Sequence, residues 1–409
     1  MKVIVAGNGI AGITVARLVR EKNPDARIRI YSQEKLHYYP RPQLTEVMGA
    51  ERLDAKDLIL YQPSWYEDRR IEVSLGVSVE RIDREASSVV LSDGSRAEYN
   101  VLVLAVGARG NRPPISGLDK QGCFTLRTFE DLLSIRQFAS NARRGVVIGG
   151  GLLGLEAAKG LRSLGLDVSV VEFFPRLLPR QLDVEGADLF RARLEAMGIR
   201  VFVNAATSAI SGEARVDGIV LKDGTTLPCD LILVSAGITP NKELAEGAGL
   251  ATGKGITVDS TMRTSDPDIF AVGDCAEHEG RIYGIIPAAT DQARVAADNI
   301  TGNATVYRGT IPSNTLKAVG IDLTSIGVVT PEADGFEEFR VRDDANGLYK
   351  KVAVRDGKVV GAIVIGETRS VPYLAQLINR GIDISSVKDR LLDAGFDLKA
   401  FVREASSKG

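Results

Sequence analysis

The sequence is poor in the residues that metal and thiol chemistry need. It has 3 cysteines and 2 histidines among 409 residues. Cys123, Cys229 and Cys275 lie far apart and form no C-x-x-C or C-x4-C pair, which argues against a metal cluster and against a vicinal redox disulfide. We expect each cysteine to be a small buried side chain. With only His37 and His278, a site of several imidazole ligands is excluded, and no metal is predicted.

The chain also lacks an excess of charge of either sign. It has 51 Lys+Arg against 53 Asp+Glu, and no basic stripe or basic amphipathic helix stands out. Nucleic acid and anionic membranes are therefore not expected as partners. No run reaches the roughly 18 apolar residues of a membrane span. Because a predicted strand begins at Lys2 without a charged leader, we expect a cytoplasmic protein.

Glycine, by contrast, is abundant and recurs in a pattern. A strand-like run over residues 2–6 leads into the glycine-rich segment 7–12 (Gly-Asn-Gly-Ile-Ala-Gly) and then an apolar helix. Residues 146–148 lead in the same way into segment 149–154 (Gly-Gly-Gly-Leu-Leu-Gly) and a second helix. Both copies have βαβ organisation. The length exceeds the roughly 250–300 residues of one core, so two or three domains are expected.

A second duplication runs without gaps. Residues 90–94 and 101–107 correspond, at one constant offset, to residues 220–224 and 231–237. Each copy predicts a strand, an Asp-Gly hairpin turn, a returning strand and a buried strand that ends in glycine. The two halves therefore share one architecture, which predicts two related domains.

Glycines in this arrangement are typical of dinucleotide binding. A pyrophosphate needs backbone N–H donors, a helix N-terminus and no side chain in the way. The first glycine of each loop permits the turn, the second lets the backbone approach the phosphates, and the third lets helix and strand pack. The predicted phosphate-binding residues are Gly7, Gly9, Ile10, Ala11 and Gly12 in the first copy and Gly149, Gly151, Leu152, Leu153 and Gly154 in the second.

An acid about 20 residues after such a loop is expected to bind the ribose hydroxyls. Glu172 occupies that place in the second copy, where a carboxylate favours NADH and repels the 2'-phosphate of NADPH. Arg176 and Arg180 nearby oppose this preference. In the first copy the acid comes two places late, so Glu34 or the hydroxyl of Ser32 is the candidate for the adenosine ribose.

These features resemble the FAD-dependent pyridine nucleotide-disulfide oxidoreductases of the glutathione-reductase structural class, over about residues 1–365. Beyond the glycine loops, the resemblance rests on residues 104–108, 234–241 and 264–274, the last ending Ala-Val-Gly-Asp. Residues 37–42 (His-Tyr-Tyr-Pro-Arg-Pro) and 286–294 are most similar to NADH:rubredoxin reductases and to the related NADH oxidases and nitrite-reductase flavin domains.

The resemblance implies further site residues. Asp274 would bond the ribitol chain of FAD, Glu156 would lie beside the nicotinamide, and the helix from Ala288 would direct its N-terminus at the flavin and stabilise its anionic reduced form. No acid–base residue is implied, because the flavin carries the chemistry. The other implied FAD residues are Arg41, Pro42, Val79, Ala105, Val106, Gly107, Arg127, Gly273 and Ala289, and the other implied NAD residues are Ala236, Gly237 and Ile238.

The expected fold class is α/β. We predict two Rossmann-like domains, each three-layered with a β-meander, and a small C-terminal α+β domain. FAD would bind residues 1–112 and 241–305, and NAD would bind residues 113–240. In residues 306–409, strands separated by turns at Gly320, Gly327, residues 356–357 and Gly361 precede a helical tail that includes residues 386–392. The apolar positions of the tail from Leu374 to Leu392 favour an intramolecular core over a docking face.

Departures from the family pattern exclude thiol chemistry at the flavin. The cysteine pair and the C-terminal His-Glu couple of disulfide reductases are missing, and residues 40–44 (Pro-Arg-Pro-Gln-Leu) stand where thiol peroxidases have a cysteine. Cys275 and His278 near Asp274 are interpreted as a packed cysteine and a surface histidine, and Trp65 and Tyr66 as ordinary packing.

The sequence thus predicts an FAD-dependent NAD(P)H oxidoreductase. NADH would give a hydride to flavin N5, and the electrons would pass to an iron-containing carrier or partner such as rubredoxin, ferredoxin or an iron-sulfur subunit, since three cysteines cannot hold a cluster of its own. Two alternatives stay open. One is an NADH oxidase that reduces O2, and the other is the flavin/NAD subunit of a larger oxidoreductase complex.

Overall fold

The structure is a computed structural model that describes residues 1–316, 320–331 and 333–407. It divides into two compact units. The first unit contains Met1–Asn111, Arg127–Leu132 and Gly237–Thr310, and the second contains Arg112–Leu126, Leu133–Ala236 and Ile311–Gly409. Among the described residues, none of the helices combines the length and the apolar character needed to cross a bilayer.

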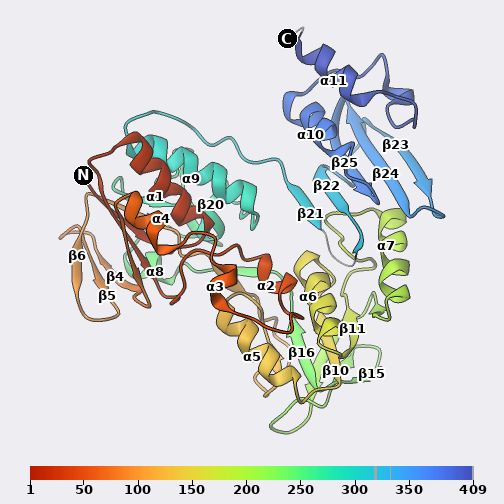
Figure 1. The fold of residues 1–409 in the computed structure, drawn as a ribbon, viewed down its shortest axis with the longest axis horizontal. Helices are drawn as coiled ribbons and strands as arrows, with labels where there is room; N and C mark the ends of the chain where they lie inside the picture. Colours follow the sequence, from red (N-terminus) through yellow and green to blue (C-terminus); the bar gives the residue numbers. More distant parts are fainter. Residues whose placement is uncertain (317–319, 332, 408–409) are drawn as a thin grey trace. The chain divides into compact units, whose positions relative to one another are not determined.

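A five-stranded parallel sheet forms the core of the first unit. Its order is β19-β7-β1-β2-β3, with β1 (Lys2–Ala6), β2 (Arg27–Ser32), β3 (Ile71–Leu75), β7 (Val101–Leu104) and β19 (Ile269–Ala271). Strands β1, β7 and β19 are short apolar runs, as expected where both faces of a parallel sheet are covered, whereas β2 and β3 include polar residues. Helices α1 (Ile10–Lys22) and α9 (Ile286–Ile300) pack side by side (Figure 1), since α9 buries a row of alanines.

The second unit repeats this design. Its parallel sheet has the order β12-β11-β10-β16-β9, with β9 (Cys123–Phe124), β10 (Arg144–Ile148), β11 (Asp167–Val171), β12 (Arg200–Phe202) and β16 (Leu231–Val234). Its helices include α6 (Leu152–Ser163) and α7 (Val184–Ala196), while α5 (Phe129–Ala139) begins in the first unit and ends in the second. The glycine-loop strand is central in both sheets, which confirms the predicted duplication and the α/β fold class.

Each unit also carries the predicted meander. In the first unit it consists of β4 (Val79–Asp83), β5 (Ser88–Leu91) and β6 (Arg96–Glu98), and in the second of β13 (Thr207–Ser211), β14 (Gly218–Leu221) and β15 (Thr226–Pro228). Gly94 and Gly224 adopt φ of +82° and +88°, the left-handed conformation that an Asp-Gly hairpin turn needs. Both predicted hairpins are confirmed.

The segments that follow the two duplicated strands pair with each other. β8 (Ala108–Gly110) runs antiparallel to β17 (Ile238–Pro240), with Arg109 opposite Thr239. The N–H of Asn111 donates to the carbonyl of Gly237 (2.9 Å), and at the equivalent positions of the repeat the N–H of Asn241 donates to the carbonyl of Gly107 (3.0 Å). The internal repeat therefore appears in the hydrogen bonding as well as in the sequence.

Short elements complete the first unit. They lie in the connections between the strands of its main sheet or follow the last of these strands, where the predicted site residues Gly273 and Asp274 stand. They are α2 (Gln43–Glu46), α3 (Ala55–Leu58), α4 (Pro63–Asp68), α8 (Glu243–Gly247), β18 (Ile256–Val258), the 3-10 turn η1 (Gly273–Cys275) and β20 (Ala276–His278).

The C-terminal part of the second unit is an antiparallel sheet of order β21-β22-β25-β24-β23. Its strands are β21 (Ser313–Leu316), β22 (Leu323–Gly327), β23 (Phe336–Asp343), β24 (Leu348–Arg355) and β25 (Lys358–Ile365). Gly361 lies inside β25 and not in a turn, so that prediction was wrong. A Cβ at Gly361 would come 1.8 Å from the carbonyl oxygen of Val328, so the glycine is needed for a close backbone approach.

The tail packs against this sheet through α10 (Val371–Arg380) and α11 (Leu398–Ser407) (Figure 1). The helix predicted over residues 386–392 is wrong: only a 3-10 turn, η3 (Lys388–Arg390), forms there. Val387 and Leu391 have the spacing of a helix, but they belong to an irregular segment whose side chains are buried against the C-terminal sheet. The predicted intramolecular core is confirmed, because Leu374, Leu377, Ile378, Ile384, Val387 and Leu391 are buried together, with Ile382 and Leu392 packed against them.

A buried charge cluster joins α7 to the C-terminal sheet. The ammonium of Lys351, 3% exposed, lies 3.1 Å from the carboxylate of Asp183 and 2.7 Å from that of Glu338. Asp183 caps α7 by accepting the N–H of Gly186 (3.0 Å), and it also accepts the hydroxyl of Tyr349 (2.6 Å). Burial alone would raise the pKa of Asp183. The hydrogen bonds and the charge of Lys351 together outweigh burial, so the pKa of Asp183 lies below its ordinary value of 3.8.

We expect Lys351→Met to destabilise the protein by about 3–5 kcal/mol, because it leaves the largely buried carboxylate of Asp183 without its ion-pair partner and leaves Glu338 paired only with Arg340. Lys350→Met, which removes the more exposed pair with Glu367, is the matched control and should cost about 1 kcal/mol or less. Urea unfolding measures both. Since the folded pKa of Asp183 is depressed, its contribution is present above pH 3.8 and is lost as the pH falls through the folded value. Equal losses in the two variants would contradict this account.

Candidate dinucleotide sites

The first glycine loop connects β1 to α1. Gly7 has φ of +112°, and a Cβ there would lie 2.2 Å from the carbonyl oxygen of Ala105. A Cβ at Gly12 would lie 2.1 Å from the carbonyl oxygen of Gly7, so helix and loop pack backbone to backbone. At Gly9, which caps α1 without a side-chain hydrogen bond, an added Cβ would meet no atom of the described residues within 4 Å. Gly7 and Gly12 therefore pack closely against backbone, while the space beside Gly9 at the helix N-terminus is open, as the binding of an anion there requires.

The second loop reproduces these distances. A Cβ at Gly149 (φ +115°) would lie 2.2 Å from the carbonyl oxygen of Ser235, and one at Gly154 would lie 2.1 Å from that of Gly149. A Cβ at Gly151, the N-cap of α6, would have no neighbour within 4 Å in the described part of the chain. In both loops, the glycine of the turn, the glycine that lets the backbone approach the phosphates and the glycine at the helix–strand contact thus have the geometry that the sequence predicts.

Three elements meet beside the first loop. Gly273 has φ of +80°, and a Cβ there would lie 2.9 Å from the Cβ of Ala11 and 3.9 Å from that of Ala289. The N–H of Gly273 donates to the buried side-chain oxygen of Gln292 (2.8 Å). Helix α9 begins at Ile286, two residues before the predicted Ala288, which is itself buried. The N-terminal turns of α1 and α9 therefore lie on either side of the predicted Gly-Asp motif.

The charged residues predicted around FAD form one network. A guanidinium nitrogen of Arg127 lies 2.5 Å from the carboxylate of Asp274, and Arg41 donates to the carbonyl of Arg127 (2.8 Å). Arg41 also forms an ion pair with Glu34. Glu34 is therefore held by a cation, while Ser32 is buried at the end of β2. The structure brings Glu34, Arg41, Arg127 and Asp274 together although they come from widely separated segments of the first unit.

Tyr66, which no sequence motif singles out, contacts the first glycine loop. The hydroxyl of Tyr66 lies 3.2 Å from the side-chain nitrogen of Asn8 in the glycine loop and accepts the N–H of Tyr38 (3.2 Å). Interpreting Tyr66 as ordinary packing was therefore incomplete, whereas Trp65 does pack, stacked on Tyr61 at 4.2 Å. These contacts join residues far apart in the chain, so no local pattern could have revealed them.

Tyr39 adds a second set of contacts. Its hydroxyl donates to Glu34 and accepts the N–H of Phe129 (3.0 Å), and burial raises its pKa, so the phenol stays a neutral donor. Gln43, the first residue of α2 after Pro42, has a buried side-chain oxygen that finds no partner among the described residues. This oxygen is an acceptor available to a donor outside the described chain.

Glu172 stands at the end of β11 and is 5% exposed. Its carboxylate accepts the N–H of Gly150 in the glycine loop (2.6 Å) and the N–H of Phe174 (2.8 Å). Arg176 donates to the carbonyls of Leu182 and Pro179 of its own loop. The Arg176 guanidinium is therefore engaged with backbone carbonyls of its own loop.

The remaining predicted residues divide between the units. Val79 begins β4, Val106 and Gly107 follow β7, and Leu152 and Leu153 form the first turn of α6. Glu156 is half-buried one turn further along α6. Of the NAD residues implied by the resemblance, Ala236 ends a segment of the second unit, whereas Gly237 and Ile238 begin a segment of the first.

The cysteines are unsuited to redox chemistry. Burial raises the pKa of Cys229 to about 12 and that of Cys275 to about 11, so both remain thiols at neutral pH. Cys123 is only half-buried, because β9 lies at a sheet edge, so the expectation of three buried cysteines was wrong for one of them. The interpretation of His278 as a surface residue was also wrong: it is 3% exposed and lies 3.3 Å from the hydroxyl of Ser260.

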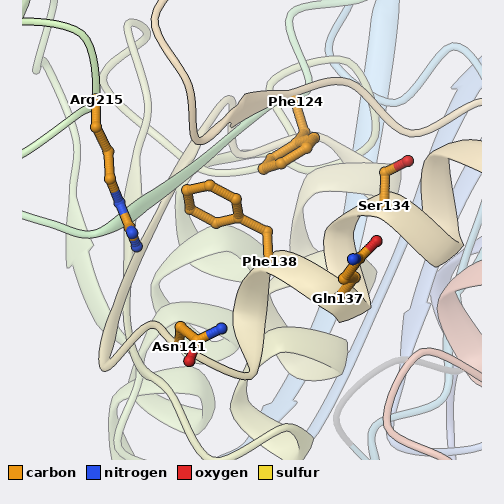
Figure 2. Close-up of a pocket in the computed structure, with 6 residues that line it drawn as sticks. All are labelled: Phe124, Ser134, Gln137, Phe138, Asn141 and Arg215. Atoms are coloured by element: carbon orange, nitrogen blue, oxygen red, sulfur yellow. The ribbon is translucent and has the colours of Figure 1, made fainter.

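A separate pocket of about 360 Å³ lies in the second unit (Figure 2). The guanidinium carbon of Arg215 is 4.5 Å from the ring centroid of Phe138. The pocket is lined by Phe124, Ser134, Gln137, Phe138, Asn141 and Arg215. None of the predicted dinucleotide residues lines it. The candidate sites are therefore the open glycine cradles and not this pocket.

Comparison with known proteins decides the family. The sequence pattern of the pyridine nucleotide-disulphide oxidoreductases matches residues 1–298, and that of the rubredoxin NAD+ reductase C-terminal domain matches residues 312–382. The chain belongs to the pyridine nucleotide-disulphide oxidoreductase family. Membership confirms the predicted fold class, the assignment as an oxidoreductase and the cofactors FAD and NAD(H).

Among relatives within this family, the chain is 36% identical over 395 residues to the assimilatory nitrate reductase electron transfer subunit of Bacillus subtilis, covering 96% of this chain and 51% of the relative. It is 32% identical to the ferredoxin–NAD(+) reductase component of the biphenyl dioxygenase system of Paraburkholderia xenovorans, covering 98% of each. The crystal structure of the ferredoxin reductase for the CYP199A2 system of Rhodopseudomonas palustris superposes with a TM-score of 0.90 at 33% identity, covering 98% of this chain and 99% of that one. The chain spans about half the length of the first curated relatives it matches.

The residues present fit both family cofactors. Both cradles leave open space in front of an uncapped helix N-terminus, where a Cβ at Gly9 or Gly151 would otherwise stand. In the first unit, the unpartnered oxygen of Gln43 supplies an acceptor of the kind that a ring N–H of a flavin would use.

Proposed function

We propose that the chain is an NADH:acceptor oxidoreductase in which the first glycine loop holds FAD and the second holds NADH. The observation that carries this is the near-identical geometry of the two loops, with an acid hydrogen-bonded to the second loop at Gly150. The residues proposed for FAD are those around Gly9, Arg41, Arg127 and Asp274. When bound, FAD accepts two electrons as a hydride and can release them one at a time.

In this proposal the protein contributes binding and orientation rather than acid–base chemistry. Helix N-termini at α1 and α9 bring partial positive charge to the region of Gly273, which favours an anionic group there. Cys275, the cysteine nearest in sequence to Asp274, stays protonated and donates to the carbonyls of Leu104 and Val272. A thiol intermediate is therefore not part of the proposal.

The proposed acceptor is an iron-containing carrier of the rubredoxin or ferredoxin kind, and the proposed compartment is the cytoplasm. The match of residues 312–382 to the rubredoxin NAD+ reductase C-terminal domain and the ferredoxin reductase relatives support this acceptor class. A second candidate is the flavin/NAD part of a larger oxidoreductase. It is favoured by relatives among nitrate and nitrite reductases that are about twice as long as this chain.

The acceptor is tested by reducing the flavin with NADH under anaerobic conditions and then mixing it with rubredoxin, a [2Fe–2S] ferredoxin or oxygenated buffer. The proposal expects reoxidation by at least one iron protein to be much faster than by oxygen. Fast reoxidation by oxygen alone would show an NADH oxidase instead. Reoxidation by neither, with co-purification of an untagged partner subunit, would favour the larger complex.

The preference for NADH is tested at Glu172. We expect the natural protein to have a higher kcat/KM for NADH than for NADPH, and Glu172→Gln to reduce that ratio by roughly 10- to 100-fold. The variant removes a negative charge facing the 2'-phosphate and weakens a charge-assisted hydrogen bond worth about 1.5–3 kcal/mol. Glu213→Gln, at an exposed loop of the same unit, is the control and should leave the ratio unchanged. An NADPH preference in the natural protein would contradict the proposal.

A further inference from the structure

Two adjacent phenylalanines project into solvent directly after Glu172. Phe173 is 63% exposed and Phe174 is 50% exposed, while the other ten phenylalanines of the chain, all within the described residues, are buried or half-buried. The two rings lie edge to face, with centroids 5.4 Å apart and an interplanar angle of 89°. Exposing two neighbouring aromatic rings forgoes a large hydrophobic stabilisation. Such a pair marks a surface that binds something.

The backbone that carries the rings is fixed. Glu172 donates its N–H to the carbonyl of Phe202 (2.8 Å), its own carbonyl accepts the N–H of Ala205 (2.9 Å), and the carbonyl of Phe174 accepts the N–H of Asn204 (3.0 Å). The Glu172 carboxylate adds bonds to the N–H groups of Gly150 and Phe174. The rings are therefore attached to a backbone segment that is hydrogen-bonded both to the end of β12 and to the glycine loop.

We propose that Phe173 and Phe174 form the platform on which the adenine ring of the nicotinamide dinucleotide stacks. This inference rests on the proposed function. A ribose whose 2'-hydroxyl is bound by Glu172 carries adenine on the adjacent C1' atom, so the base comes within reach of the residues that follow Glu172. Those residues are the two exposed rings, and adenine offers the flat π-face that aromatic side chains bind.

The corresponding place in the first unit is built differently. The residue that aligns with Glu172 is Ser32, and it is followed by Gln33 and Glu34, the latter paired with Arg41. An aromatic pair is thus particular to the second loop. The alternative occupants, a second copy of the chain or another protein, would have to cover the rings without involving the ribose-binding acid.

The test separates ligands with and without adenine. Calorimetry would measure the Kd of ADP-ribose, and anaerobic stopped-flow reduction would measure the Kd of NADH and of reduced nicotinamide mononucleotide, which has no adenine. The double variant Phe173→Ala/Phe174→Ala should weaken ADP-ribose and NADH by roughly 10- to 100-fold and leave the mononucleotide and the limiting rate of flavin reduction unchanged. Phe173→Tyr/Phe174→Tyr, which keeps both aromatic faces, should restore the natural affinities.

Val184, 61% exposed at the start of α7, provides the control: Val184→Ala removes exposed apolar surface from the same unit and should change none of the constants. Unchanged ADP-ribose affinity in the double alanine variant would overturn the proposal, as would an equal loss for NADH and the mononucleotide. Loss of self-association or partner binding without loss of ADP-ribose affinity would assign the rings to a protein contact and overturn it as well. If the natural protein bound none of the three ligands, the proposed function itself would fail, which is a different result.

Discussion

Gly9→Val should yield a folded protein that binds FAD at least about 100-fold more weakly than the natural chain and purifies with little flavin. Gly9 has φ −79° and ψ −176°, an extended conformation that valine adopts readily, and an added Cβ meets nothing within 4 Å in the described chain. The isopropyl group instead occupies the space in front of the α1 N-terminus. It would cost two charge-assisted hydrogen bonds to pyrophosphate at about 1.5–3 kcal/mol each, and about 1.4 kcal/mol is tenfold in Kd.

The measurement is the flavin absorbance per chain after purification, followed by the Kd of added FAD from quenching of its fluorescence. Urea unfolding of the flavin-free proteins checks that the fold is intact. Gly247→Ala, in α8 where an added Cβ also finds open space, is the control and should retain FAD. A Gly9→Val protein with a full complement of FAD would refute the assignment of the first loop.

Gly151→Val should give the reverse phenotype. This variant is expected to carry a full complement of FAD but to bind NADH roughly 100-fold more weakly, because Gly151 has the same extended conformation (φ −80°, ψ 178°) and the same open surroundings as Gly9. Stopped-flow reduction at increasing NADH concentration gives the Kd. Dithionite, which needs no nucleotide site, should reduce the variant as fast as the natural protein.

Gly9→Val and Gly151→Val control for each other, since the substitution, the backbone conformation and the local geometry match. Loss of flavin from both variants would mean that the second loop supports the fold instead of binding NADH. Reduction of Gly151→Val by NADH at the natural rate and affinity would show that the nucleotide binds elsewhere.

Local sequence was sufficient to predict the glycine loops. The roles of Gly12 and Gly154 follow from backbone contacts with Gly7 and Gly149 of the same loop, and the Asp-Gly hairpins follow from two residues each. These features depend on neighbours in the chain, so pattern and geometry agree. The gap-free duplication could be predicted for the same reason, because both copies fold the same local elements.

The features that sequence reasoning missed or misjudged depend on distant contacts. Tyr66 hydrogen-bonds Asn8, from which it is distant in sequence. The ion pair of Lys351 with Asp183 likewise joins β24 to the N-cap of α7, and the whole meander β13–β15 lies between the two in sequence. His278 is buried because Ser260 and Tyr307 cover it, which no run of neighbouring residues indicates. The helix predicted over residues 386–392 fails because buried irregular chain and helix can present apolar side chains at the same spacing.

The central claim is that two matched loops hold two different dinucleotides, one as resident FAD and one as the electron donor. It is tested most directly by anaerobic titration of the FAD-loaded natural protein with NADH, followed by the visible absorbance of the flavin. The account predicts complete bleaching at one NADH per FAD. Flavin that stays oxidised with excess NADH and NADPH, yet is reduced by dithionite, would contradict it.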